Sequence, residues 1–415
     1  MKSSAGGLAK AAWLLAAIYY FYQYALRSAP GVMMPQLAGA FGLSAAGMAS
    51  TIGLFYYGYA PFSLVAGAAV DRLGAKAVVP VGALMTGVGA LLFATGNLAA
   101  ANIGRFLQGA GGVFALIGAI YIVTQSFPPS RAATLIGATQ MFGSSGGSAG
   151  QFLVGPMIAA GLAWNTFWTA MGIAGVVIAV LLALLLPKST SKLDDGWLAS
   201  AAAAIFAVFR NPQSLLCGLI AGLLFIPTTV FDMIWGVRFL QEGRGFDYAD
   251  AVMRSATVPV GWVIGSPLLG MISDRLGRRK PVLAAGSAVL LACLAWILYG
   301  QSSLLPPHVL GLVTGISSGA AMLPYTIIKE TNQPNLAGTS TGVISFMNFS
   351  LSAVAGPLFG KIMSTVSGSG QPRLEQYQTT FQPLLFGVAL ALVFTLALRE
   401  TGPAMRIPAA IEETV

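Results

Sequence analysis

Charged residues are too rare in this chain to cover a water-facing surface. Only 8% of its 415 residues are charged, whereas 56% are hydrophobic. A soluble domain carries about 25% charged residues. The surroundings of most of this chain are therefore predicted to be lipid.

The long apolar runs predict an all-α integral membrane protein with twelve transmembrane helices in two six-helix pseudo-symmetric bundles. A spanning helix with its turn uses about 30 to 35 residues, because about 20 cross the hydrocarbon. The predicted spans are 11–36, 46–70, 77–96, 99–126, 132–161, 166–187, 212–240, 248–272, 281–300, 306–329, 338–366 and 377–398. The first run is too long for a secretory signal peptide and is interpreted as a retained span.

The basic residues predict how the spans are oriented. Loops and tails on the side of the N-terminus hold Lys2, Lys10, Arg72, Lys76, Arg131, Lys188, Lys192, Arg210, Arg275, Arg278, Arg279, Lys280, Arg399 and Arg406, whereas the opposite loops hold Arg244 and Arg373. This bias predicts a bacterial-type inner (plasma) membrane protein with both termini in the cytoplasm. The same bias explains the net charge of +9, so no nucleic-acid partner is expected.

The chain repeats itself, which divides it into two halves. Asp71-Arg72-Leu73-Gly74 reappears as Asp274-Arg275-Leu276-Gly277, an offset of 274 − 71 = 203 residues. We expect an N-terminal bundle over 1–187, a linker with an amphipathic surface helix over 188–211, a C-terminal bundle over 212–400 and a cytoplasmic tail over 401–415. Repeated halves with a binding site between them are typical of transporters.

The repeated loops resemble the signature of the major facilitator superfamily. Gly67 to Lys76 is similar to the loop between the second and third helices of that family, and Gly270 to Lys280 is the better-matching second copy. Ala75 departs from the pattern, because a basic residue is expected there. The resemblance implies that Asp71, Arg72, Asp274, Arg275 and Arg278 act in gating. The alternative is that these charges only mark cytoplasmic loops.

Arg27 lies well inside the first span. A guanidinium at that depth is costly and usually faces a watery cavity or a partner. Tyr20, Gln23 and Tyr24 precede it by seven, four and three residues, so they share its helical face. With Pro35, Arg27 resembles the first helix of the organophosphate:phosphate antiporter and anion:cation symporter branches, which implies binding of an anionic group. The alternative is a structural arginine paired with a carbonyl or carboxylate.

Asp232 lies inside the seventh span, and the repeat offset maps Arg27 onto position 230 nearby. Burial and a neighbouring cation shift a carboxyl pKa in opposite directions, so Asp232 is a candidate proton carrier. The phosphate branch implies a second arginine near Thr229, which is absent here. One arginine and one acid favour a monocarboxylate or a zwitterion over a phosphate ester. The alternative is an internal ion pair of Asp232 with Arg27, Arg238 or Arg254.

Other polar and aromatic residues in the spans are weaker candidates. The predicted substrate contacts also include Gln108, Gln140, Thr229, Trp235, Tyr325 and Asn348, although polar side chains also join membrane helices. Lys329 and Glu330 are interpreted as a local ion pair. Cys217 and Cys293 lie in apolar runs without metal-ligand spacing, so neither a metal nor a cofactor is expected.

These features favour a monomeric, proton-coupled transporter of a small organic anion that works by alternating access. No phosphate-binding loop for ATP is present, and no nucleophile or metalloprotease motif suggests an enzyme. A proton/drug antiporter is the alternative, although it requires an acidic cavity, which Arg27 opposes. A transport-dead sensor would carry a further soluble domain, and a channel would need a continuous pore.

Overall fold

The computed structural model describes residues 2–127, 129–186, 197–301, 307–333, 336–367 and 372–402, and every regular element in these ranges is a helix. The first half contains α1 (Lys2–Val32), α2 (Met34–Phe41), α3 (Ala45–Leu73), α4 (Ala75–Ala94), α5 (Leu98–Ser126), α6 (Pro129–Phe152), α7 (Val154–Ala159) and α8 (Trp164–Leu185). The predicted all-α membrane fold is confirmed.

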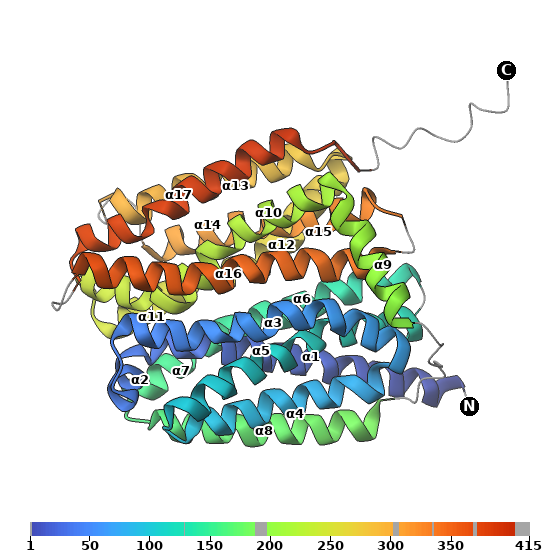
Figure 1. The fold of residues 1–415 in the computed structure, drawn as a ribbon, viewed down its shortest axis with the longest axis horizontal. Helices are drawn as coiled ribbons and strands as arrows, with labels where there is room; N and C mark the ends of the chain where they lie inside the picture. Colours follow the sequence, from blue (N-terminus) through green and yellow to red (C-terminus); the bar gives the residue numbers. More distant parts are fainter. Residues whose placement is uncertain are drawn as a thin grey trace.

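The second half begins after α9 (Trp197–Arg210) and repeats this arrangement. It contains α10 (Pro212–Ile226), η1 (Pro227–Gly236), η2 (Phe239–Gly243), α11 (Tyr248–Ser255), α12 (Thr257–Leu276), α13 (Lys280–Tyr299), α14 (Pro307–Ser318), η3 (Gly319–Met322), α15 (Leu323–Glu330), α16 (Ala337–Ser367) and α17 (Leu374–Ala397). In Figure 1 the long helices run side by side, with α1 to α8 in the lower part, α10 to α17 in the upper part and α9 crossing at the right-hand end.

Nine of the described helices are long and apolar enough to cross a membrane, or ten if α2 and α3, which are bent by 103° at their junction, count as one span. The other two predicted spans correspond mainly to α1 and α6. Both are long helices, of 31 and 24 residues, but they are less apolar because they carry polar residues. α1 and α6 pack against each other, and Trp13 and Tyr20 of α1 hydrogen-bond Thr139 and Gln140 of α6, so lipid does not have to solvate these polar groups.

Local sequence fixes where the second half starts. Asn211 accepts a hydrogen bond from the backbone N–H of Gln213 at 3.0 Å, and Pro212 occupies the first helical position. An Asn cap followed by Pro is a strong helix start, because the cap satisfies a free N–H and Pro has none to satisfy. Pro227 then interrupts the helix, since it cannot donate to the preceding turn. The following ten residues, Pro227–Gly236, are π-helical.

The two halves meet through specific helix pairs. α3 packs along α16, α6 packs along α12, and α1 contacts η1. At the last of these contacts Gly31 is required, because a Cβ at position 31 would overlap the backbone carbonyl oxygen of Met233. Tyr56 on α3 also donates a hydrogen bond to the carbonyl of Thr229 at 2.8 Å. The halves are therefore closed against each other at the end of the molecule opposite α9.

Gly31→Val is expected to disfavour this closed arrangement and to slow transport at least tenfold, because η1 must move away from the added side chain. Gly39→Val is the matched control, since a Cβ at Gly39 meets nothing within 4 Å. Transport rates in vesicles and thiol labelling of cysteines placed at this end measure both effects. Equal rates for the two variants would contradict this role of the contact.

Candidate functional site

A cavity of about 230 Å³ lies between the two halves. Its aromatic lining comes from both halves and consists of Tyr20, Tyr24, Tyr59, Phe225, Trp262, Tyr325 and Phe349. Its polar lining consists of Gln140, Ser144, Ser266, Lys329, Thr341 and Ser345. Of the predicted substrate contacts, the structure brings Tyr20, Tyr24, Gln140 and Tyr325 together here. We call this space the central cavity.

Hydroxyl and amide groups form hydrogen bonds on each side of the central cavity, within each half. The Tyr20 hydroxyl lies 3.3 Å from Oε1 of Gln140 and 3.4 Å from the Tyr24 hydroxyl, which are long, weak hydrogen bonds. Asn348 donates from Nδ2 to the Tyr325 hydroxyl at 3.1 Å. These groups can exchange their present partners for a bound molecule at little cost.

Arg27 lies one turn beyond Tyr24, toward the closed end of the molecule. It is only 3% exposed, and its guanidinium carbon lies 4.0 Å from the ring centre of Tyr24 and 5.7 Å from that of Phe349. Both rings line the central cavity, whereas Arg27 is separated from the lining by them. Its Nε and Nη1 are buried without a hydrogen-bond partner among the described residues. Arg27 therefore retains donors that a ligand can use.

Arg105 is buried like Arg27 but is satisfied. It donates to the carbonyls of Ile52 and Leu26 and, at 2.6 Å, to Oε1 of Gln108. These bonds join α5 to α3 and α1. Arg105 thus holds helices together, and Gln108 serves as its acceptor outside the cavity lining.

The remaining predicted contacts lie away from the central cavity. Gln23 is fully buried, and both atoms of its amide group lack described partners. Thr229 bonds the carbonyl of Phe225 and the hydroxyl of Ser352, which joins η1 to α16. Trp235 is fully buried and packs its ring against Phe381. Their helical positions are as expected, but they face neighbouring helices.

Lys329 is a cation of the cavity that the sequence analysis missed. It lies in the last turn of α15, lines the central cavity and has an exposed side chain. The expected local pair with Glu330 is wrong, because Glu330 binds Arg279 at 2.9 Å. Lys329 makes no ion pair with any residue that the structure describes. Its exposure indicates that the cavity reaches solvent at the end that carries α9.

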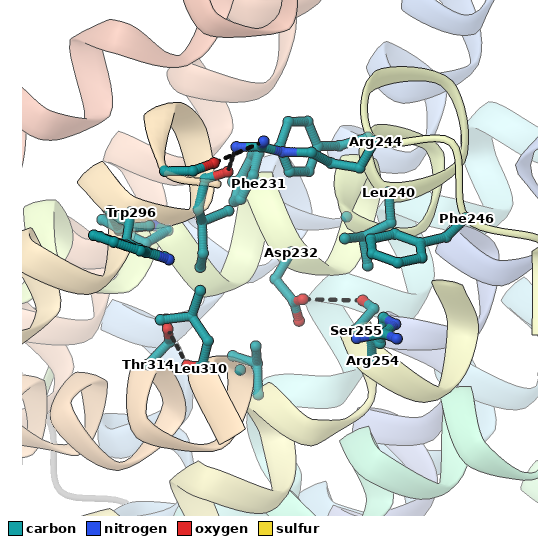
Figure 2. Close-up of a pocket in the computed structure, with 18 of the residues that line it drawn as sticks. Phe231, Asp232, Leu240, Arg244, Phe246, Arg254, Ser255, Trp296, Leu310 and Thr314 are labelled. Atoms are coloured by element: carbon teal, nitrogen blue, oxygen red, sulfur yellow. Dashed lines mark hydrogen bonds between the residues drawn. The ribbon is translucent and has the colours of Figure 1, made fainter. Parts of the chain in front are cut away.

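Asp232 faces a second pocket, which lies entirely within the second half (Figure 2). Its Oδ1 accepts a hydrogen bond from Ser255 at 2.9 Å, whereas Oδ2 is buried and has no described partner. The proposed ion pairs of Asp232 are wrong, because Arg238 binds Glu242 and Arg254 binds Asp250, and the unpartnered donors of Arg27 exclude the third. None of the residues around this pocket lines the central cavity.

The predicted gating residues differ in their contacts. The side chains of Asp71 and Arg72 lie outside the described part of the structure. Asp274 is bound by Arg279 and not by Arg275, which is exposed and forms no ion pair with a described residue. Arg278 lies 3.6 Å from Glu400 and is 58% exposed. In the second motif the acid is therefore contacted by Arg279, which was not among the predicted gating residues.

Within the described ranges, no group of three or more His, Cys, Asp or Glu side chains could hold a metal ion. Both cysteines are buried and unbridged. The described residues thus provide a cavity between the two halves with Arg27 and Lys329 near it, and a separate pocket that contains Asp232.

Comparison with known proteins agrees with the fold. The family model described as "Major Facilitator Superfamily" matches residues 16–357. The "Hexuronate transporter" of Bacillus subtilis is 27% identical over 373 residues, which cover 83% of this chain and 86% of that relative. The "Multidrug resistance protein Stp" of Mycobacterium tuberculosis is 22% identical over 401 residues, covering 83% and 74%.

A solved structure has the same architecture. The crystal structure of the nucleoside transporter NupG superimposes with a TM-score of 0.72 at 14% identity and covers 93% of this chain and 99% of that chain. Identity at this level shows the fold alone. The relatives and the fold are those of transporters and not of enzymes.

Proposed function

Because this chain belongs to the Major Facilitator Superfamily and is therefore a secondary transporter, we propose that its substrate is a small organic anion, a monocarboxylate or a zwitterion, moved together with protons by alternating access. The two halves rock about the central cavity, which opens first to one side of the membrane and then to the other. The cavity at present reaches solvent at the end that carries α9.

The observation that carries this proposal is the charge of the central cavity. Lys329 lines it, Arg27 lies directly behind two of its rings, and no Asp or Glu is among the lining residues that the structure describes. An excess of positive charge in a cleft with low-dielectric walls attracts an anion and repels a cation. The hexuronate transporter is named for a substrate that is a carboxylate, which also favours an anion as the substrate.

Arg27 binds the carboxylate, and the aromatic rings hold the body of the substrate. Arginine binds a carboxylate through two parallel N–H···O bonds, and such charged bonds are about twice as strong as neutral ones. The unpartnered Nε and Nη1 of Arg27 are available for this role once Tyr24 and Phe349 move aside. Tyr20, Gln140, Tyr325 and, through it, Asn348 hydrogen-bond the remaining polar atoms.

Uptake into proteoliposomes tests the proposal directly. A thermal-shift screen against monocarboxylates, sugar acids and amino acids identifies the substrate, since a ligand that binds only the folded state raises its stability. With one proton per anion, each unit of pH difference, about 1.4 kcal/mol, supports about tenfold accumulation. Uptake that ignores the pH gradient would contradict the proton coupling.

Lys329→Gln is expected to weaken anion binding about tenfold while leaving the fold intact. Lys329 is exposed, so its attraction for the anion is screened and smaller than that of a buried cation. The dependence of uptake on salt concentration should also decrease, because the long-range attraction into the cavity is reduced. Lys361→Gln, at an exposed position outside the cavity lining, is the matched control. An equal loss of anion binding in both variants would show that Lys329 does not contribute to the anion-binding site.

Proton/drug antiport is the second candidate, and the aromatic lining is the observation that favours it. Such rings suit any flat apolar molecule, and one relative is named a multidrug resistance protein. A lipophilic cation would, however, require an acid in the lining. Resistance profiling of cells that express the chain separates the two, since an anion importer gives no resistance to cationic drugs.

The proposed membrane placement follows from the distribution of basic residues. The protein lies in an inner membrane with both termini in the cytoplasm. Two further parts of the proposal are that it functions as a monomer and that it divides near residues 187 and 211 into its two bundles. Protease digestion of the N-terminus and of residue 400 onward in sealed vesicles of known orientation tests the topology.

A further inference from the structure

The pocket that contains Asp232 is a second site, distinct from the central cavity. Its volume is about 80 Å³, enough for a few water molecules. η1, η2, α11, α12, α13 and α14 surround it, so the first half contributes nothing to its lining. Its lining continues to Gln301, which is exposed at the end of the molecule opposite α9. We call it the upper pocket, after its place in Figure 1, where the second half lies above the first.

Among the residues that the structure describes, Asp232 is the one acid that lines the upper pocket. It is 7% exposed and its Oδ2 has no described partner; Figure 2 shows Ser255 and Arg254 on one side of the carboxyl group and Trp296 on the other. A buried carboxylate without a charge partner is costly, so such a group is stable only when it is neutral or binds a cation.

The other charged groups at this pocket have their own partners. Arg254 binds Asp250 through Nε, although its Nη1 is buried without a described partner, and Arg244 donates to the neutral carbonyls of Gly300 and Ile297. On the neighbouring elements, Arg238 binds Glu242, and Arg27 lies against Tyr24 and Phe349 on the cavity side. None of these arginines forms an ion pair with Asp232, so its Oδ2 is available to a proton.

The surroundings select a proton among possible cations. Ca²⁺ and Mg²⁺ require about six oxygen ligands. Asp232 and Ser255 supply the nearest oxygens, and the hydroxyl of Thr314 already donates to Leu310. The rest of the lining is largely aromatic or aliphatic. A proton needs one acceptor atom, and Oδ2 provides it.

We propose that Asp232 is loaded with its proton through the upper pocket and not through the central cavity, so that proton and anion reach the protein by separate routes. A hydronium ion in the pocket transfers one proton to Oδ2 and leaves a water molecule, which converts the carboxylate to the neutral acid. The idea deepens the proposed proton coupling and rests on it.

The shared wall between the two spaces explains how the routes communicate. On η1, Thr228 and Met233 line a small pocket that also contains Tyr24 and Gln140, whereas Phe231 and Asp232 line the upper pocket. On α12, Pro259 lines the small pocket and Val258 lines the upper pocket. A change of charge at Asp232 thus acts on the same π-helical segment that contacts α1 near Arg27.

Infrared spectroscopy of the protein in nanodiscs tests this route without any substrate. After a rapid drop in pH, the carboxylic-acid C=O band of Asp232 should appear in the wild type, and this band should be absent from Asp232→Asn. Asp247→Asn is the matched control, because Asp247 is exposed, caps α11 and lies outside the pocket, and Asn is an equally good cap.

Blocking one space at a time distinguishes the routes. In a Cys217→Ala, Cys293→Ala background, Leu310→Cys lies in the upper pocket and Met322→Cys lies in the central cavity. Attaching a bulky thiol reagent at position 310 should slow the appearance of the Asp232 band at least tenfold, whereas the same label at position 322 should leave it unchanged. The reverse pattern, or equal slowing by both labels, overturns the proposed route. Neither outcome depends on the uptake experiment, which tests the proton coupling itself.

Discussion

Arg27→Met is expected to reduce transport of the substrate anion by about 100-fold or more, while the empty protein becomes no less stable. Removing one member of a buried, hydrogen-bonded charge pair costs about 2 to 5 kcal/mol, and each 1.4 kcal/mol is a factor of ten. Methionine fills a similar volume but provides neither the charge nor the donors. Uptake into proteoliposomes and the thermal shift produced by the anion measure the effect.

The expected stability follows from the contacts that Arg27 lacks. Its Nε and Nη1 are buried without described partners, and an unsatisfied buried donor destabilises the folded state. The stacking on Tyr24 offsets only part of this cost. Without ligand, Arg27→Met should therefore melt at the same temperature as the wild type or above it.

Arg105→Met is the matched control, because Arg105 is equally buried but fully engaged. It should lower the melting temperature, since the buried hydrogen bonds to the carbonyls of Ile52 and Leu26 and to Oε1 of Gln108 would be lost. Arg27→Lys separates charge from geometry, because a lysine keeps the charge but loses the paired donors. If Arg27→Met transports normally, the arginine is structural and the anion site lies elsewhere.

The sequence predicted the membrane fold and the polar stripe on α1 because both depend on composition and helical periodicity. Tyr20, Tyr24 and Arg27 recur at spacings that place them on one face, and the structure places all three at the central cavity or directly behind it. Asp232 was also recognised as an unusual buried charge. Its cost in lipid makes such a residue visible without a structure.

The opposite face of the cavity could not be predicted in the same way. Phe225, Trp262 and Phe349 lie in apolar spans, where a ring that faces a cavity and a ring that faces lipid look alike in sequence. Which pocket Asp232 faces depends on its rotation about the helix axis, and the π-helical turn after Pro227 changes that rotation. Depth along a span can be estimated from sequence, but direction around it requires the packing of neighbouring helices.

For a similar reason, the sequence did not show that Arg279, and not Arg278, binds Asp274. The two arginines are adjacent and chemically equal, so sequence alone does not choose between them. Gly277 ends α12 with φ at 66°, in the left-handed region, and reverses the chain there. After this turn Arg279 faces inward, toward Asp274 and Glu330, and Arg278 faces outward.

Arg279→Ala is accordingly expected to destabilise the protein by about 3 to 5 kcal/mol, whereas Arg278→Ala should cost less than about 1 kcal/mol. The Arg279 side chain is 7% exposed and binds Glu330, which is 16% exposed, so its removal leaves a partly buried carboxylate uncompensated. Asp274 is 66% exposed and contributes little, because water screens it. Thermal unfolding in detergent should rank the two variants clearly.

Combining Arg279→Met with Glu330→Met separates the effect of this ion pair on stability from its effect on gating. Replacing both members of a buried ion pair by apolar residues is often neutral, because no charge is then left without a partner. The double variant should therefore melt near the wild-type temperature. If the pair also holds the start of α13 against α15 during the transport cycle, this stable double variant will still transport at least tenfold more slowly. Normal transport by a stable double variant would limit the pair to a structural role and would remove the second motif from gating.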